Sequence, residues 1–336
     1  YIGGDSPITV QTMVKVDAHD VKAVVRQIRE QEEVGCDITR MNVLDTESVK
    51  NFSKIKKQIK IPIVADIHIN YLWALEAIRQ GVDKLRINPG NIGGPDKVKQ
   101  VVKLAKERGV PIRIGVNSGS LEKDLLEKYK HPTAEALVES ASRHIKILED
   151  LDFDQIVVSL KTSNVRQMIE ANRLFSKTYD YPVHLGVTEA GPPKIGTVVS
   201  SMGIGSLLME GIGDTIRVSL TGDPREEIRV GKEILKQLGL KRGPILISCP
   251  TCSRTSYNML PLVEKVEKYL DKVEAPIKVA VMGCAVNGPG EAREADVGIA
   301  GGRGAGVLFA KGEIVRIVKE EEMFEVLVKW IKKLIA

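Results

Sequence analysis

Three cysteines and one glutamate are the residues of this 336-residue chain best suited to metal chemistry. Cys249 and Cys252 lie three residues apart in S-C-P-T-C-S, and Cys284 precedes Glu291 by seven residues in M-G-C-A-V-N-G-P-G-E-A. Thiolates are the common ligands of zinc sites and iron–sulfur clusters. Because no fourth cysteine lies nearby, the set predicts three strong ligands and a weak or open fourth position, which is typical of a catalytic metal site.

Zinc and iron–sulfur are the two centres that this set could build. A structural zinc site usually has four cysteine or histidine ligands, and no histidine follows His184, so zinc would need Glu291 or a residue from the first part of the chain. Three thiolates would leave one iron of a [4Fe–4S] cube with a different ligand. Glu291 is within reach of that iron and could give way to a substrate oxygen; otherwise it is a carboxylate on a surface loop. Cys36, at the start of a strand-like run, is expected to be a buried apolar residue.

The part of the chain before these cysteines alternates short β-rich runs with amphipathic stretches. The predicted strands are Ile8–Met13, Asp37–Met41, Ile61–Ala65, Lys84–Ile87, Pro111–Val116, Gln155–Leu160, Val183–Val187 and Thr215–Leu220. The predicted helices are Asp20–Val34, Tyr71–Gln80, Pro95–Gly109, Thr133–Asp150, Asn164–Lys177 and Asp223–Leu238. This alternation predicts a (β/α)₈ TIM barrel over residues 1–241, with an open doubly wound sheet as the alternative.

The run K-R-G-P at residues 241–244 interrupts the alternation and predicts a second domain over residues 242–336. Its predicted elements are Ile245–Ser248, Leu260–Val273, Ile277–Met282, Val307–Ala310, Glu313–Val318 and Glu320–Ile335. Both cysteine turns directly follow predicted strands. We therefore expect a small α/β domain that carries the metal centre.

Polar residues gather toward the ends of seven of the eight predicted barrel strands, where a TIM barrel places its active site. They are Arg40, Asp66, His68, Arg86, Asn88, Arg113, Asn117, Lys161, Thr188, Glu189, Arg217 and Ser219. The five cations among them come from five different strands, and like charges in one cleft repel unless an anion neutralises them. Because arginine binds phosphate oxygens bidentately, these residues predict a site for a diphosphate or a similar phosphoester.

The acidic residues and the histidine in this group each allow two interpretations. Asp66 and Glu189 either pair with neighbouring arginines or handle protons and orient a substrate hydroxyl. His68 is expected to be structural or to orient the substrate, with a general acid as the alternative.

Composition excludes several classes of function. The net charge is +5 with both signs mixed along the chain, and only 4% of residues are aromatic, which argues against a nucleic-acid groove. No apolar run reaches the length of a membrane span, and no signal-peptide pattern opens the chain. Four cysteines in a chain of this length are not a disulfide framework, so we expect a cytoplasmic protein. The sequence begins at Tyr1 rather than methionine, and some of the N-terminus is expected to precede it.

The chain closely resembles the bacterial 4-hydroxy-3-methylbut-2-enyl diphosphate synthases of the non-mevalonate isoprenoid pathway. The resemblance runs through nearly the whole chain and lies in specific motifs in a fixed order. They are G-G-D-S-P-I-T-V-Q-T-M, A-D-I-H-I-N-Y, R-I-N-P-G-N-I-G, G-V-N-S-G-S-L, H-L-G-V-T-E-A-G, S-C-P-T-C-S-R-T and M-G-C-A-V-N-G-P-G-E-A. Thr12 stands where the family often has serine, and the lack of a large inserted domain is similar to the two-domain bacterial type.

This resemblance implies an oxidoreductase that acts on CH or CH₂ groups. It implies reductive opening of 2-C-methyl-D-erythritol 2,4-cyclodiphosphate with loss of water, which gives the allylic diphosphate. Two electrons would arrive one at a time from reduced flavodoxin or ferredoxin through a [4Fe–4S] cluster.

The resemblance also implies roles for residues that match the family motifs. The implied cluster ligands are Cys249, Cys252, Cys284 and Glu291. The implied diphosphate-binding residues are Arg40, Arg86, Arg113, Asn117 and Lys161. Residues implied to lie near the reacting carbon or the phosphates are Thr188, Glu189, Ser219 and Asn287. Glu189 and Glu291 are the two carboxylates for which we predict catalytic roles.

The path of the chain also predicts an assembly. The predicted helix Asp223–Leu238 runs back from the catalytic end of the barrel for about 24 Å. The second domain would then begin at the end opposite the cations, so its cluster could not easily reach phosphates bound by its own barrel. We therefore predict a head-to-tail homodimer in which each cluster domain covers the partner's barrel, as the resemblance also implies.

Two other functions fit the same residues. One is a phosphate-binding barrel lyase or transferase with a structural zinc domain, and the other is a non-enzymatic iron–sulfur scaffold or sensor. Metal and acid-labile sulfide analysis would separate zinc from iron–sulfur, and turnover of the cyclodiphosphate would separate an enzyme from a sensor.

Overall fold

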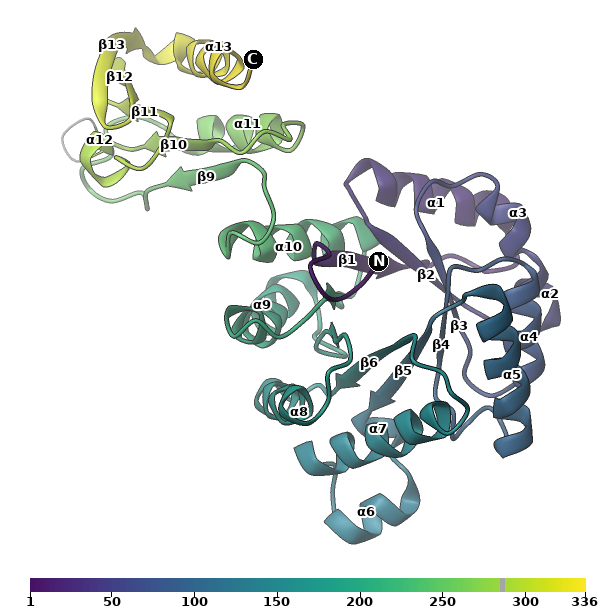
Figure 1. The fold of residues 1–336 in the computed structure, drawn as a ribbon. Helices are drawn as coiled ribbons and strands as arrows, with labels where there is room; N and C mark the ends of the chain where they lie inside the picture. The colour runs from purple at the N-terminus through teal and green to yellow at the C-terminus, as the bar shows by residue number, and fades with distance from the viewer. Residues whose placement is uncertain (285–287) are drawn as a thin grey trace. The chain divides into compact units, whose positions relative to one another are not determined.

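The chain folds into two compact units, residues Tyr1–Leu238 and Gly239–Ala336, in a computed structural model. The structure describes residues 1–284 and 288–336, apart from the side chains of Pro289 and Glu291. Each unit has its own hydrophobic core and is described here by itself (Figure 1).

The first unit is built on eight parallel strands. They are β1 Thr9–Met13, β2 Ile38–Asn42, β3 Ile63–Asp66, β4 Lys84–Ile87, β5 Ile112–Asn117, β6 Ile156–Lys161, β7 His184–Leu185 and β8 Thr215–Ile216. Their order in the sheet is β6-β5-β4-β3-β2-β1-β8-β7, and a parallel bridge between Val158 and Val183 joins β6 to the start of β7. The sheet is thus nearly closed, which confirms the predicted TIM barrel and excludes the open doubly wound sheet.

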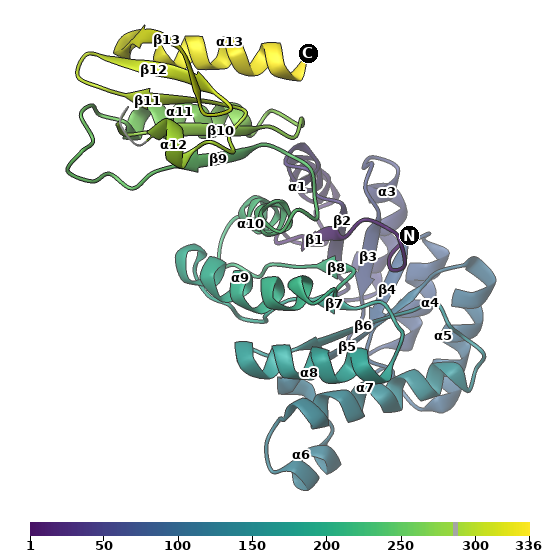
Figure 2. The same cartoon turned by 60° about the vertical axis from the view of Figure 1, so that its left-hand side comes forward.

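Helices surround this barrel in the β/α alternation (Figures 1 and 2). They are α1 Val21–Glu33, α2 Thr46–Lys50, α3 Phe52–Lys56, α4 Tyr71–Arg79, α5 Pro95–Arg108, α6 Lys123–Tyr129, α7 Ala134–Glu149, α8 Val165–Thr178, α9 Pro193–Met209 and α10 Pro224–Gln237, with a 3₁₀ turn at Ser118–Ser120. In α1 the side chain of Asp20 accepts a hydrogen bond from the Ala23 N–H, and Val24, Val25 and Ile28 are buried. Capping and a periodic apolar stripe therefore start this helix and hold it on the sheet.

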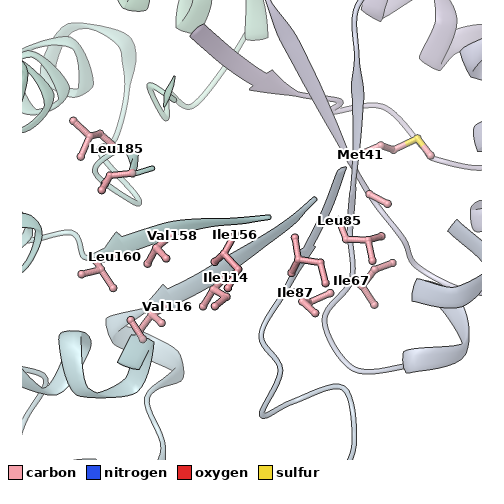
Figure 3. Close-up of a cluster of buried hydrophobic side chains, with 14 of the residues drawn as sticks. Met41, Ile67, Leu85, Ile87, Ile114, Val116, Ile156, Val158, Leu160 and Leu185 are labelled. Carbon is pink, nitrogen blue, oxygen red and sulfur yellow. The ribbon is translucent and has the colours of Figure 1, made fainter. Parts of the chain in front are cut away.

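Alternation along the strands separates an apolar outer face from a polar inner one. Strand residues such as Leu85, Ile87 and Ile114 belong to the core between the sheet and the helices (Figure 3). Successive side chains on a strand point to opposite faces, so Lys84, Arg86 and their equivalents on other strands face the barrel lumen. This lumen carries charged groups where most TIM barrels have branched aliphatic side chains.

The structure differs from the predicted elements of the barrel in three respects. Helix α9 was not predicted, because it is apolar on both faces and contains Gly196, Gly203 and Gly205, so no amphipathic period marks it. Strands β7 and β8 are regular for only two residues each, since the chain after them leaves the sheet to form loops at the end of the barrel. The short α2, α3 and α6 were also not predicted.

The second unit is a mixed five-stranded sheet covered mainly on one face (Figure 2). Its elements are β9 Ile245–Ser248, α11 Leu260–Leu270, β10 Lys278–Met282, α12 Gly288–Glu291, β11 Val297–Gly301, β12 Ala305–Ala310, β13 Glu313–Lys319, a 3₁₀ turn at Glu320–Glu322 and α13 Met323–Ile335. The order is β13-β12-β11-β10-β9, in which β9, β10 and β11 are parallel and β12 and β13 antiparallel. Side chains of α11 and α13 form the larger core with this sheet.

Strand β11 in the centre of this sheet was not predicted. Its sequence V-G-I-A-G has only two β-branched residues and two glycines, so its β propensity is weak. All five residues are buried, and pairing with both neighbours stabilises the strand in place of propensity. Within the described part of the chain, the helices are too short or too polar to cross a bilayer.

We predict that Gly301→Ala destabilises the second unit. A methyl group at Gly301 would lie 1.8 Å from a ring carbon of Tyr257, whose hydroxyl donates to the Met282 carbonyl at 3.2 Å. Moving that ring should lower the free energy of unfolding by about 1–3 kcal/mol, measured by chemical denaturation of the full chain. Gly290→Ala, where the added methyl meets no atom within 4 Å, is the matched control. Equal stability of the two variants would contradict this packing.

Candidate active site

Asp66 at the end of β3 is the carboxylate that holds two of the predicted cations together. Its two oxygens lie 3.3 Å from Arg40 Nε and 3.0 Å from Arg86 Nη1, and all three side chains are largely buried. Burial alone would raise the pKa of Asp66, but Arg40, His68 and Arg86 outweigh it and hold that pKa well below its usual range. One buried anion thus balances only part of the positive charge at this end of the barrel.

Two inward-facing glycines give the cations room to lie across the lumen. A methyl group at Gly115 on β5 would lie 2.4 Å from Arg86 Nε. One at Gly186, just after β7, would lie 2.9 Å from Lys161 Nζ and 2.5 Å from the Arg217 carbonyl oxygen. Any larger residue at either position would push a guanidinium or an ammonium group out of place. The sequence analysis missed both glycines, although a glycine within a strand commonly marks such a close approach.

Arg113 is 1% exposed, and its Nε and Nη1 have no hydrogen-bond partner among the described residues. Burial lowers the pKa of Arg113, and Arg40 and Arg86 lower it further. Lys161 is 8% exposed, and burial followed by Arg113 lowers its pKa. Buried donors without acceptors cost free energy, which a bound anion would recover. The two side chains thus fit the predicted anion site.

A shallow pocket of about 150 Å³ brings together three other predicted residues. Glu189, Arg217 and Ser219 line it, with Lys15 and Thr221. Glu189 has a φ of 55°, in the left-handed region that a non-glycine residue adopts at a cost of about 1 kcal/mol or more. Such strain is common at functional sites, and Glu189 lines the same pocket as Arg217.

Glu227 in the first turn of α10 is a buried carboxylate beside the pocket that sequence reasoning missed. It is 1% exposed and accepts hydrogen bonds from Thr12 Oγ1 at 2.6 Å and from the Leu220 N–H at 3.0 Å. Lys15 Nζ lies 2.9 Å from it and Arg217 Nη2 lies 3.6 Å away. Glu227 therefore ties β1, the loop after β8 and two cations to one point. Nothing in the sequence around Glu227 marks it as part of this region. Its hydrogen-bond partner Thr12 lies far away in the sequence and must carry a hydroxyl group to donate to it.

The remaining predicted barrel residues surround the same end. His68 is exposed, and its Nδ1 lies 3.3 Å from Arg86 Nη1. The ion pairs between Asp66 and the two arginines therefore help to position this ring. Asn88 is buried, and its side-chain oxygen accepts the Gly90 N–H at 3.0 Å, which makes it a turn-forming residue. Asn117 ends β5, and Thr188 precedes Glu189; both are half-buried.

The cysteine turns of the second unit lie against one another. Cys249 follows β9 and Cys284 follows β10, and these strands are parallel neighbours. The Gly283 N–H donates to Cys249 Sγ at 3.1 Å, and a methyl group at Gly283 would lie 2.6 Å from Thr255 Oγ1. Cys252 is exposed, and the backbone N–H of Arg254 lowers the pKa of its thiol, which favours the metal-binding thiolate. None of the four cysteines is in a disulfide.

These turns fit a cysteine-ligated cluster in donor type and connectivity. Among the residues that the structure describes, no three potential ligands converge at metal-binding distance. Asn287 and the side chain of Glu291 lie outside the described residues, so the predictions for them stay predictions. Cys36 is buried as predicted; its burial raises the pKa of the thiol to about 12.

Comparison with known proteins identifies the family. The sequence matches the GcpE TIM-barrel domain over residues 1–232 and the GcpE protein C-terminal domain over residues 245–333. The chain belongs to the GcpE family. This confirms the family predicted from the motifs, and with it an enzymatic, oxidoreductase function.

Relatives of this GcpE-family chain share its whole length. A 4-hydroxy-3-methylbut-2-en-1-yl diphosphate synthase (flavodoxin) of Clostridium acetobutylicum is 59% identical over 330 residues, which are 98% of this chain and 95% of that protein. Enzymes of the same name from Clostridium perfringens and Thermodesulfovibrio yellowstonii are 58% and 57% identical over 99% of this chain and 95% of each relative.

Solved structures that resemble this GcpE-family chain share only its fold. The dihydropteroate synthase of Yersinia pestis is 12% identical with a TM-score of 0.52, and covers 70% of this chain and 94% of its own. That of Stenotrophomonas maltophilia has a TM-score of 0.51 at 12% identity, with 70% and 92% coverage. Both support the barrel and carry no argument about activity.

We predict that Asp66→Asn destabilises the barrel in a pH-dependent way. The variant leaves the Arg40 and Arg86 cations without their buried anion, which should lower the free energy of unfolding by about 3 kcal/mol at pH 7. Because the pKa of Asp66 is depressed in the folded state, its contribution is present above the unfolded pKa near ~4 and is lost as the pH falls. Urea unfolding should therefore show the difference from wild type shrinking in acid.

The exposed Asp5→Asn is the control for this experiment and should behave as wild type at each pH. A constant difference between Asp66→Asn and wild type from pH 7 into acid would contradict the ion-pair cluster.

Proposed function

We propose that this chain is a 4-hydroxy-3-methylbut-2-en-1-yl diphosphate synthase that reductively opens 2-C-methyl-D-erythritol 2,4-cyclodiphosphate with loss of water. The relatives that share its whole length carry that enzyme name. The observation that carries the proposal is the group of buried cations with unpaired donors at one end of the barrel, which favours an anionic substrate. A cyclic diphosphate has the charge and the size for such a site.

The cations bind the substrate through its phosphates in this proposal. Arg113 offers two donors, Nε and Nη1, that have no partner among the described residues, and Asp66 holds Arg40 and Arg86 at the same end of the barrel, to which Lys161 adds a buried ammonium group. Since arginine forks match phosphate oxygens, these four residues fix the orientation of the ring. Asn117 supplies a further donor at the end of β5.

Glu189, with Ser219 and Thr188, is proposed to act at the reacting end of the substrate. A hydroxyl leaves as water only if it gains a proton, and Glu189 is the carboxyl group of the pocket that also contains Arg217. Ser219 and Thr188 would hold substrate oxygens by hydrogen bonds. His68 and Asn88 keep the neighbouring loops in place, through Arg86 and the Gly90 N–H.

The cysteine turns are proposed to hold a [4Fe–4S] cluster through Cys249, Cys252 and Cys284, with Glu291 as the fourth ligand. The cluster would supply the two electrons of the reaction. The Gly283 N–H that donates to Cys249 Sγ favours a thiolate at this position. Reduced flavodoxin is the proposed electron donor because it is part of the relatives' name, and ferredoxin is the alternative. Free thiols are consistent with a reducing cytoplasm.

Two kinds of variant should separate the cluster from the substrate site. Each of Cys249→Ser, Cys252→Ser and Cys284→Ser should abolish the visible absorption of the anaerobically reconstituted protein together with turnover of the cyclodiphosphate by reduced flavodoxin. Arg113→Ala should keep the absorption and weaken substrate binding by about 2 kcal/mol or more, at least ~30-fold in Kd. Arg166→Ala, an exposed arginine on α8, is the control and should bind normally.

Metal and acid-labile sulfide analysis belongs to the same experiment. Zinc in place of iron and sulfide would favour a structural metal domain. An iron–sulfur absorption that survives the loss of two of these cysteines would contradict the ligand assignment.

We propose further that the enzyme is a head-to-tail homodimer in which the second unit of one protomer covers the barrel of the other. An exposed apolar stripe along α9 supports self-association. It consists of Ile195, Val198, Met202 and Met209, each between 57% and 77% exposed. Side chains at this spacing share one side of a helix, and a contiguous apolar patch on a surface is typical of a protein interface.

A charge in the middle of the α9 stripe should therefore disrupt the dimer. We expect Met202→Glu to run as a monomer in size-exclusion chromatography with light scattering, with an intact barrel by circular dichroism. Turnover should fall by at least about tenfold, since neither protomer then has the partner's cluster over its substrate. Gln100→Glu, an exposed change on α5, should leave both properties unchanged. A monomeric Met202→Glu variant with full turnover would contradict the proposal that each active site is built from two protomers.

A further inference from the structure

We call Arg40, Arg86, Arg113 and Lys161 the cation cluster. The barrel lumen beneath this cluster contains polar side chains that substrate binding alone does not explain. Lys84 at the start of β4, Gln11 on β1 and His184 on β7 face inward there, below the residues that would meet a ligand. Their exposed fractions are 4% or less. A TIM barrel normally fills these layers with branched aliphatic side chains, which pack without polar atoms.

Several atoms of this layer have no hydrogen-bond partner among the described residues. They include Lys84 Nζ, both polar side-chain atoms of Gln11, and His184 Nε2. Thr9 Oγ1 on β1 also has no hydrogen-bond partner among the described residues. An unpaired polar group in a protein interior lowers stability, so such a set persists only where water or function maintains it.

Lys84 is the residue of this layer whose charge can change near neutral pH. Burial lowers its pKa to about 7, and the neighbouring Arg113 cation contributes to the shift. His184 also faces it, but burial lowers the pKa of His184 well below its usual range, so this ring stays neutral. Asp66, the carboxylate on β3, is paired with Arg40 and Arg86 instead.

We propose that Lys84 is a positioning residue for the phosphates: it is only partly protonated in the empty barrel, takes up a proton when the diphosphate binds, and then adds a positive charge beneath Arg113. This inference rests on the proposed function, because it requires an anion at the cation cluster. It extends that function by a residue that lies outside the strand-end set.

The physical reason is the balance of charge around Arg113. In the empty barrel, a second cation next to a fully buried arginine is unfavourable, because neither is solvated and they repel. A diphosphate at the mouth neutralises Arg113 and places negative charge above the lumen, so protonated Lys84 becomes favourable. By linkage, a ligand that raises the pKa of a group binds more tightly where that group is protonated. Binding should therefore weaken as the pH rises above 7.

The test is calorimetric titration of the cyclodiphosphate into the oxidised holoenzyme without reductant, so that no turnover occurs. Titrations at pH 6, 7 and 8 in two buffers of different ionisation enthalpy give the number of protons taken up. Each phosphorus of the ligand has one ester bond, one anhydride bond and one strongly acidic hydroxyl that is ionised throughout this range, so the ligand contributes none. Wild type should take up about 0.5 proton at pH 7 and approach ~1 at pH 8, with affinity about fivefold weaker at pH 8 than at pH 7.

Lys84→Met and Lys84→Gln should remove this proton uptake and make the affinity nearly independent of pH over the same interval. Both should bind less tightly than wild type at pH 6. Each should also melt at a higher temperature than wild type when ligand-free, because a buried group that is charged in the unfolded chain has been removed. Lys99→Met, an exposed lysine on α5, is the matched control and should keep the wild-type proton uptake.

The outcomes separate this inference from the proposed function. If wild type shows no binding of the cyclodiphosphate, the proposed function fails. If it binds without proton uptake, or if both Lys84 variants take up protons as wild type does, the role of Lys84 is refuted while the proposed function stands.

Discussion

Positive charge that faces inward is the constraint on which the barrel depends. Arg40, Arg86, Arg113 and Lys161 are each 9% exposed or less, and they share one lumen. Such a group is unfavourable in a folded chain without anions, because each charge loses its water and meets others of the same sign. The outer face of the same strands must supply the compensating stability, and residues such as Leu85 and Ile114 do so by packing under the helices.

Two small devices make this charge density possible. Asp66 and Glu227 are buried carboxylates that each hold two cations, so the positive charge is spread between two separate anchors. Gly115 and Gly186 remove the side chains that would otherwise fill the space of Arg86 and Lys161. The cations are thus preorganised for phosphate before any ligand binds, which reduces the entropy cost of ordering their side chains on binding.

The sequence predicts the architecture well where periodicity and position agree. The alternation of strands with helices predicts a barrel, and a barrel places its active site at the C-terminal ends of its strands. The residues of the site could therefore be predicted from their positions near those ends. Arg40 and Asp66, from different strands, could therefore be assigned to one place. Strand β11 escaped because it is buried on both faces, and helix α9 escaped because its exposed side is apolar as well, so neither shows a local hydrophobic period.

The parts of the site that could not be predicted act through geometry at a distance. Glu227 lies in a helix 215 residues from its partner Thr12, so no spacing in the sequence connects them. The sequence predicts Lys84 only as the first residue of a strand. That its ammonium group is buried follows from its inward orientation next to Arg113, which only the structure shows. The side chain of Glu291 and residue Asn287 remain assigned by resemblance alone.

The two units place their reactive groups by the same rule. In the barrel the cations lie on parallel strands, and in the second unit Cys249 and Cys284 directly follow the parallel neighbours β9 and β10. Backbone N–H groups at such strand ends are free to turn toward a ligand, as the Gly283 N–H does toward Cys249 Sγ. A ligand at either end adds interactions that the empty fold lacks. The free chain is therefore less stable than the loaded one, and each ligand should stabilise the unit that binds it.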